Sequence, residues 1–126
     1  MRDKQMIIEL LDNIENSLSL IVEQTQNYAS ADDFLRTPAG VLLLDGVYMN
    51  LLAIGEAVKN LDKRTGGELL PKYPAVPWKD IMRTRDVIAH HYFDVDAERV
   101  FLILRNDVPP LLDTIQQIKA DLQKEK

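Results

Sequence analysis

The chain has 126 residues and 46% hydrophobic content, which is enough for one core and predicts a single domain over residues 1–126. It has no cysteine, so disulfides, thiolate metal sites and cysteine nucleophiles are excluded. The formal net charge of −5 argues against general affinity for nucleic acids. Because no apolar run approaches about 18 residues and the charged N-terminus is not a signal peptide, we expect a cytoplasmic protein that does not bind membranes.

The first part of the chain carries the signals of a long helix followed by a short one. Apolar residues recur every three or four positions over residues 3–28, which predicts an amphipathic helix. Ser30 is placed to cap the short helix. Thr37 is placed as the N-cap of a further helix, with Pro38 at its first helical position.

The segment 38–61 is the most apolar of the chain. So wide an apolar surface is buried on more than one side, either at the centre of a bundle or against both the core and a second subunit. Gly46 and Gly55 each cost about 1 kcal/mol relative to alanine inside a helix. We therefore expect another helix to approach this one closely at the two glycines.

Three prolines mark the segment 68–77 as a connector. We expect Trp78, which follows it, to anchor the next helix against the core rather than to stack on a nucleotide. Asp96 is a suitable N-cap for a later helix, which Pro109-Pro110 interrupts before its apolar stripe continues to Leu122. The chain as a whole predicts an all-α, up-and-down bundle of four to five helices.

The densest chemistry lies in one run that holds both histidines, Arg85-Asp86-Val87-Ile88-Ala89-His90-His91-Tyr92. Wound as a helix at about 100° per residue, the run places five residues on one arc: Arg85, Asp86, Ala89, His90 and Tyr92. Asp86 and His90 are four residues apart, so a hydrogen bond between them could fix the imidazole tautomer. This arrangement would give a shallow notch lined by a guanidinium, an imidazole and a phenol, which suits a phosphodiester.

A solvated helix face is the competing interpretation of this arc, because Arg, Asp and His are common on exposed helix surfaces. His91 falls on the apolar arc or at the helix end. We therefore expect a structural role for His91, as a core or capping residue.

The spacing of Arg85, His90 and Tyr92 resembles the R-x4-H-x-Y signature of HepT-type HEPN domain proteins. Flanking segments resemble the same family in order and spacing: Ile54-Gly55-Glu56-Ala57, Trp78 with Ile81, and Tyr92-Phe93-Asp94-Val95-Asp96. Together the matches extend from about Leu10 to Leu112. One departure is Asp86, because many members have Asn directly after the Arg. Its negative charge either weakens RNA binding or orients His90 more firmly.

The resemblance implies a cytoplasmic all-α homodimer that acts as an endoribonuclease without a metal or other cofactor. It also implies the toxin of a toxin–antitoxin pair, whose partner is a minimal nucleotidyltransferase. By this resemblance, Arg85 and His90 would be the catalytic residues, and Tyr92 would be the residue to which the partner attaches AMP.

Metal-free cleavage is consistent with the residues present. We hypothesise that His90 removes the proton of a 2′-hydroxyl and that Arg85 holds the phosphate, giving a 2′,3′-cyclic phosphate and a 5′-hydroxyl. One chain offers only one suitable histidine, so two-fold pairing of two motifs would supply the acid for the leaving oxygen.

Positive charge is concentrated in residues 59–85, where seven cations and three anions give a local charge of +4. Lys79 and Arg83 are therefore candidate RNA contacts, with a solvated face as the alternative. Two other functions stay open: a non-catalytic HEPN subunit that binds a nucleotidyltransferase and helps present its substrate, and a purely structural helical dimer. The intact set of Arg85, His90 and Tyr92 favours the nuclease, because an adaptor has no chemical need to keep it.

Overall fold

The computed structural model describes residues 3–89 and 96–125, with side chains for residues 3–84 and 96–125. These ranges contain six α-helices, one short 3-10 helix and no strand, which confirms the all-α prediction. The elements along the chain are α1 (Lys4–Thr25), α2 (Ala31–Leu35), α3 (Pro38–Arg64), η1 (Leu70–Lys72), α4 (Trp78–Ala89), α5 (Ala97–Asn106) and α6 (Val108–Lys124). The number of helices exceeds the predicted four to five because α2 is separate and Asp107 divides α5 from α6.

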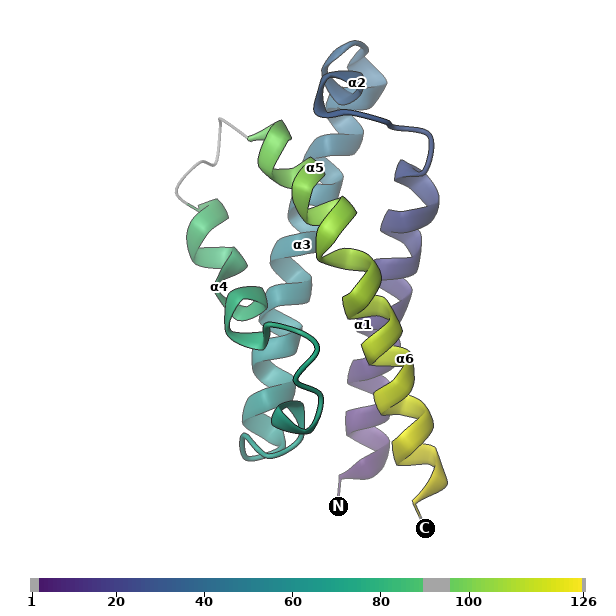
Figure 1. The fold of residues 1–126 in the computed structure, drawn as a ribbon, viewed down its shortest axis with the longest axis vertical. Helices are drawn as coiled ribbons and strands as arrows, with labels where there is room; N and C mark the ends of the chain where they lie inside the picture. Colours follow the sequence, from purple (N-terminus) through teal and green to yellow (C-terminus); the bar gives the residue numbers. More distant parts are fainter. Residues whose placement is uncertain (1–2, 90–95, 126) are drawn as a thin grey trace.

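The long helices α1, α3 and α6 form the body of the bundle (Figure 1). Helix α1 packs against both α3 and α6, and α4 packs against α3. Helix α5 contacts α2 and α6, and both chain termini lie at the end of the bundle opposite α2 (Figure 1). Helix α4 is therefore held from one side by the most apolar helix of the chain.

The core draws on every helix. The predicted stripe of α1 is confirmed, because its buried residues recur at three and four positions: Ile7, Leu11, Ile14, Leu18 and Ile21. Twelve side chains in the described ranges are less than 2% exposed, and they form one cluster: Phe34, Ile7, Leu11, Ile14, Leu18, Ile21, Leu61, Leu70, Ile115, Ile118, Val58 and Val108. Burial of this apolar area is the main force that holds the bundle together.

Three helices begin at the polar residues that the sequence predicted as N-caps. In each case the side-chain oxygen accepts a backbone N–H three residues on, which satisfies a donor that the helix itself leaves free. The pairs are Ser30 with Asp33 at 3.3 Å, Thr37 with Gly40 at 2.9 Å, and Asp96 with Arg99 at 3.1 Å.

The two glycines at which the sequence predicted a close helix, Gly46 and Gly55, have different surroundings. A Cβ added at Gly55 would lie 3.1 Å from the carbonyl oxygen of Ile81, so the predicted close approach of another helix is confirmed there, with α4 as the neighbour. At Gly46 no atom of the described chain would lie within 4 Å of an added Cβ. The same expectation is therefore wrong at Gly46 for contacts within the described part of one chain.

Gly40 is a second close approach, which its position in the sequence did not reveal. A Cβ there would collide with the backbone carbonyl of Phe34, which is fixed in the core. We expect Gly40→Ala to lower the free energy of unfolding by about 1–3 kcal/mol, because α2 must shift. Gly46→Ala is the matched substitution in open space, and it should stabilise the monomer by up to about 1 kcal/mol. Urea denaturation of both variants tests this, and equal effects would contradict it.

By length and composition alone, α3 could also cross a membrane, with a mean hydropathy of 1.6 over its most apolar window. The core helix of a bundle has the same properties. Nine residues of α3 are buried against the rest of the chain: Gly40, Leu44, Val47, Tyr48, Leu51, Ile54, Gly55, Val58 and Leu61. Packing within the bundle thus explains the apolar residues on one side of α3. That the protein does not bind membranes stays a prediction.

Candidate active site

The motif begins in the last turns of α4. Arg85 and Asp86 belong to this helix, and the side chains from Arg85 to Ala89 lie outside the described part of the structure. The segment 90–95, with the predicted base His90 and the predicted modification site Tyr92, lies outside the described residues altogether. The predicted grouping of Arg85, Asp86, His90 and Tyr92 in one notch therefore stays a prediction.

Trp78 anchors the start of α4, as predicted. Its side chain is 8% exposed, and its indole Nε1 donates a hydrogen bond of 2.9 Å to the carbonyl oxygen of Tyr73. The hydroxyl of Tyr73 donates in turn to Asp121 Oδ2 in α6 at 2.6 Å, and burial together with Asp121 raises the pKa of Tyr73 to about 12. The connector before α4 is thus tied to α6, which fixes where α4 begins.

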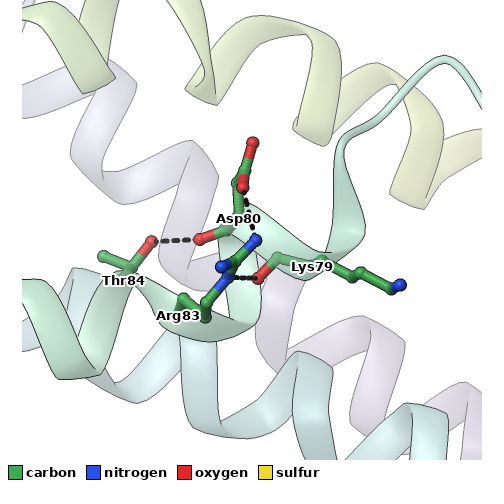
Figure 2. Close-up of polar contacts among 4 residues, drawn as sticks. All are labelled: Lys79, Asp80, Arg83 and Thr84. Carbon is green, nitrogen blue, oxygen red and sulfur yellow. Dashed lines mark hydrogen bonds and ion pairs between the residues drawn. The ribbon is translucent and has the colours of Figure 1, made fainter.

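Four polar residues occupy the first two turns of α4 (Figure 2). Arg83 Nη2 lies 3.3 Å from Asp80 Oδ1, and Arg83 Nε donates to the carbonyl oxygen of Lys79 at 3.4 Å. The hydroxyl of Thr84 donates to the carbonyl oxygen of Asp80 at 3.2 Å. The ion pair is exposed on both sides, so it adds little stability and leaves most guanidinium donors open to a ligand.

Lys79 differs from its neighbours, because its side chain extends away from the other three (Figure 2). Within the described ranges its ammonium group has no ion pair, and the side chain is exposed. Six exposed cations lie in this basic part of the chain: Lys59, Lys63, Arg64, Lys72, Lys79 and Arg83. A phosphate could therefore reach Lys79 without breaking an existing contact.

The helical register relates these cations to the motif. Lys79, Arg83 and Asp86 are spaced four and three residues apart, so they share one face of α4. Arg85 follows Ile81 by four residues, and Ile81 is buried against α3. The backbone position of Arg85 is therefore on the side of α4 nearer α3, while the two cations before it line the outer side.

A pocket of about 570 Å³ opens between the end of α3, η1 and the start of α4. Two cations, Lys79 and Arg83, and two carboxylate residues, Asp62 of α3 and Asp80 of α4, line it. The remaining walls are largely apolar, from Leu70, Pro71, Pro77, Trp78 and Met82. The structure thus brings both candidate RNA contacts to one cavity.

The first turn of α4 also carries a negative charge, Asp80, which acts on a second carboxyl group, that of Asp107. Burial raises the pKa of the Asp107 carboxyl, and the negative charge of Asp80 raises it further. Asp107 stands between α5 and α6, and its side chain makes no capping hydrogen bond. An anionic ligand is therefore disfavoured beside Asp107.

No group of three or more His, Asp or Glu residues within the described ranges has the arrangement of a metal site. The acidic residues near α4 are instead an exposed ion-pair partner, Asp80, the half-buried Asp107, and Asp62 in the wall of the pocket. In the described region the chemistry around α4 is thus that of two cations and two carboxylates at a largely apolar cavity.

A small helical bundle whose helix α4 leads into the Arg-His-Tyr motif is the class of fold that the sequence resemblance implied, and the comparisons agree. The profile of the HepT-like family, described as ribonuclease HepT-like, matches residues 7–118. The chain belongs to this family, which confirms the resemblance seen in the sequence and supports ribonuclease activity.

Named relatives cover nearly the whole chain. A "Putative RNase" of Methanocaldococcus jannaschii is 36% identical over 92% of this chain and 88% of its own length. A second "Putative RNase", from Caldanaerobacter subterraneus, is 34% identical over 92% of this chain and 94% of its own. A "Probable ribonuclease HepT" of Thermococcus cleftensis is 28% identical over 88% and 94%. No solved structure matches the chain.

Sequence reasoning did not find the pocket or the role of Asp62 in lining it. The segments that build it lie at the end of one helix, in the connector and at the start of the next. The only local signal was the proline-rich connector, because Pro71 and Pro77 both contribute to the walls.

Proposed function

We propose that this chain is the endoribonuclease toxin of a toxin–antitoxin pair, acting in the cytoplasm as a homodimer without a metal ion. One observation carries the proposal: a member of the HepT-like ribonuclease family places Arg85 in α4, followed at the family's spacing by His90 and Tyr92. The exposed cations Lys79 and Arg83 on the same helix support RNA as the substrate.

In the proposed reaction the substrate supplies its own nucleophile. His90 takes the proton of a 2′-hydroxyl, whose oxygen attacks the adjacent phosphorus. Arg85 donates hydrogen bonds to the phosphate oxygens as negative charge develops on them. The bond to the 5′-oxygen breaks, a proton from the second motif neutralises that oxygen, and the products are a 2′,3′-cyclic phosphate and a 5′-hydroxyl.

The proposed homodimer is supported by the outward face of α3. Leu42 is 73% exposed and Met49 is 54% exposed, and Gly46 lies between them on the side opposite the buried residues of this helix. An added Cβ at Gly46 would meet only open space in the described part of one chain. A second copy packing on this face would bury both side chains and would explain a glycine that the single chain does not require.

The proposed antitoxin is a minimal nucleotidyltransferase that modifies Tyr92. The phenol oxygen would attack the α-phosphorus of ATP, releasing pyrophosphate and a proton and leaving AMP on the tyrosine. The added phosphate would compete with RNA for Arg85. We expect the chain to gain the mass of one AMP on Tyr92 after incubation with the partner and ATP, and Tyr92→Phe to gain none. AMP on a different residue of the wild type would contradict the assignment.

Cleavage of RNA by the purified protein in a metal chelator tests the proposed function. Full cleavage by the wild type in chelator is expected, because neither His90 nor Arg85 needs a metal to act. Loss of cleavage in chelator and its return with added Mg²⁺ would contradict the metal-free reaction.

A further inference from the structure

The pocket before the motif has walls of two kinds. Apolar surface comes from Leu70, Pro71, Pro77 and Met82, and Leu70 is 1% exposed, so this floor is part of the core and is rigid. Polar groups stand around it, with Lys79 and the ion pair of Arg83 and Asp80 from α4 and with Asp62 from α3. An apolar floor with a few polar groups is the usual composition of a site that binds a small organic group.

The chemistry of the walls fits one nucleotide better than a purely apolar or purely anionic ligand. A base can lie on the apolar floor, while the Asp62 carboxylate can accept hydrogen bonds from its N–H groups. The exposed Lys79 and the open donors of Arg83 can hold a phosphate at the rim. The volume of about 570 Å³ lies within the range of pockets that enclose small ligands.

The position of the pocket connects it to the motif. Lys79 and Arg83 precede Arg85 by six and two residues, so they lie about 9 Å and about 3 Å before it along the helix axis. Around the axis, Arg83 and Lys79 are about 160° and about 120° away from Arg85, so the two cations lie on the outer side of α4 and Arg85 lies nearer α3. Lys79 and Arg83 can therefore hold the phosphate of a neighbouring nucleotide when the strand bends around α4 between them and Arg85. Because Asp86 shares the face of Lys79 and Arg83, this face of α4 leads from the pocket into the motif.

We propose that this pocket binds the base of a nucleotide next to the cleaved phosphodiester, with Lys79 and Arg83 on that nucleotide's phosphate. The inference rests on the proposed function, because it takes the substrate to be RNA cut at the motif. It assigns the pocket a role in choosing where a single-stranded RNA is cut, since a splayed-out base is the part of RNA that carries sequence.

Binding of 2′-O-methyl oligonucleotides tests the proposal, because they lack the attacking hydroxyl and stay intact. Single abasic positions are placed along the strand, and fluorescence anisotropy gives the dissociation constant of each. For the wild type we expect one position at which loss of the base weakens binding about tenfold, the size typical for one base held on a protein surface.

Two variants fill the pocket from opposite walls, Met82→Trp from α4 and Pro71→Trp from η1. In each folded variant, the base at the sensitive position should no longer matter to binding. Circular dichroism shows whether each variant is folded. If one of them does not fold, the other still provides the test. An equal effect of base removal in the wild type and in the filled variants overturns the proposal.

Lys79→Ala and Lys72→Ala form a matched pair, since both remove an exposed lysine and only Lys79 lines the pocket. Lys79→Ala should weaken binding several-fold and lower the salt dependence, while Lys72→Ala should have the smaller effect. Equal losses would count against the pocket. Because these readouts measure binding alone, failure of the pocket is separate from failure of cleavage, which the chelator experiment reports.

Discussion

Replacing His90 with alanine is expected to lower the rate of RNA cleavage by about 100-fold or more, the usual contribution of a positioned general base. The 2′-hydroxyl is a poor nucleophile until its proton is removed, and no second base of suitable pKa is predicted on the arc of Arg85. Binding of intact RNA should change little, because the cations that hold the strand are untouched. The measurement is the single-turnover rate of cleavage at saturating protein.

His91→Ala is the matched control for this prediction, because it removes the only other imidazole of the chain, one residue away. It should leave the cleavage rate within a small factor of the wild type wherever circular dichroism shows a folded protein. A large loss of cleavage rate in folded His91→Ala, together with full activity in His90→Ala, would show that His91 and not His90 is the general base. Full activity in both would remove histidine from the reaction.

Leu42→Asp is expected to separate the proposed dimer and to lower cleavage with it. Leu42 is 73% exposed in the single chain, so the aspartate costs the monomer little. In the dimer the substitution is present twice, and two buried charges should raise the dissociation constant by about 1,000-fold. Sedimentation measures the association, and the cleavage rate should fall in parallel if each active site needs two motifs.

Leu20→Asp is the control for Leu42→Asp, since Leu20 is also an exposed leucine on a helix, 51% exposed in α1. It should leave both association and cleavage unchanged. Gly46→Ala adds a second test. The added methyl group should stabilise the monomer, and it should weaken association if a second copy packs closely on this face. A fully dimeric Leu42→Asp protein would exclude this face of α3 as the interface.

The local features of the fold were predictable because they depend on neighbouring residues. Ser30, Thr37 and Asp96 cap helices because a short polar side chain can reach the free N–H groups just ahead of it. The all-α class followed from the period of the apolar residues, and the role of Trp78 from its place after a proline-rich connector. None of these required knowledge of which helices meet.

The features that depend on how the helices are packed could not be read in the same way. Gly46 and Gly55 look alike in the sequence, yet only Gly55 lies against another helix of the described chain. Asp107 precedes α6 without capping it, because its carboxyl lies half-buried near Asp80, where its pKa is raised. The pocket joins Asp62 to the first turns of α4 across a connector, so its composition appears only in the folded chain.

The site itself was predicted from spacing and from resemblance. The HepT-like family is confirmed over residues 7–118, and Arg85 lies in the helix that the sequence predicted. The roles of His90 and Tyr92 stay predictions, because both residues fall in the segment 90–95 outside the described ranges. Lys79 and Arg83 meet at one cavity on the way to the motif, which the sequence suggested only as a local excess of positive charge.

The chemical identity of the cut ends tests the central claim most directly, because it records which oxygen attacked the phosphorus. A defined RNA is cleaved by the wild type in chelator, and both fragments are weighed by mass spectrometry. We predict a 2′,3′-cyclic phosphate on the upstream fragment, a 5′-hydroxyl on the downstream fragment, and neither product from Arg85→Ala or His90→Ala. A 3′-hydroxyl with a 5′-phosphate would show that water or hydroxide attacked instead, and would contradict the reaction assigned to these two residues.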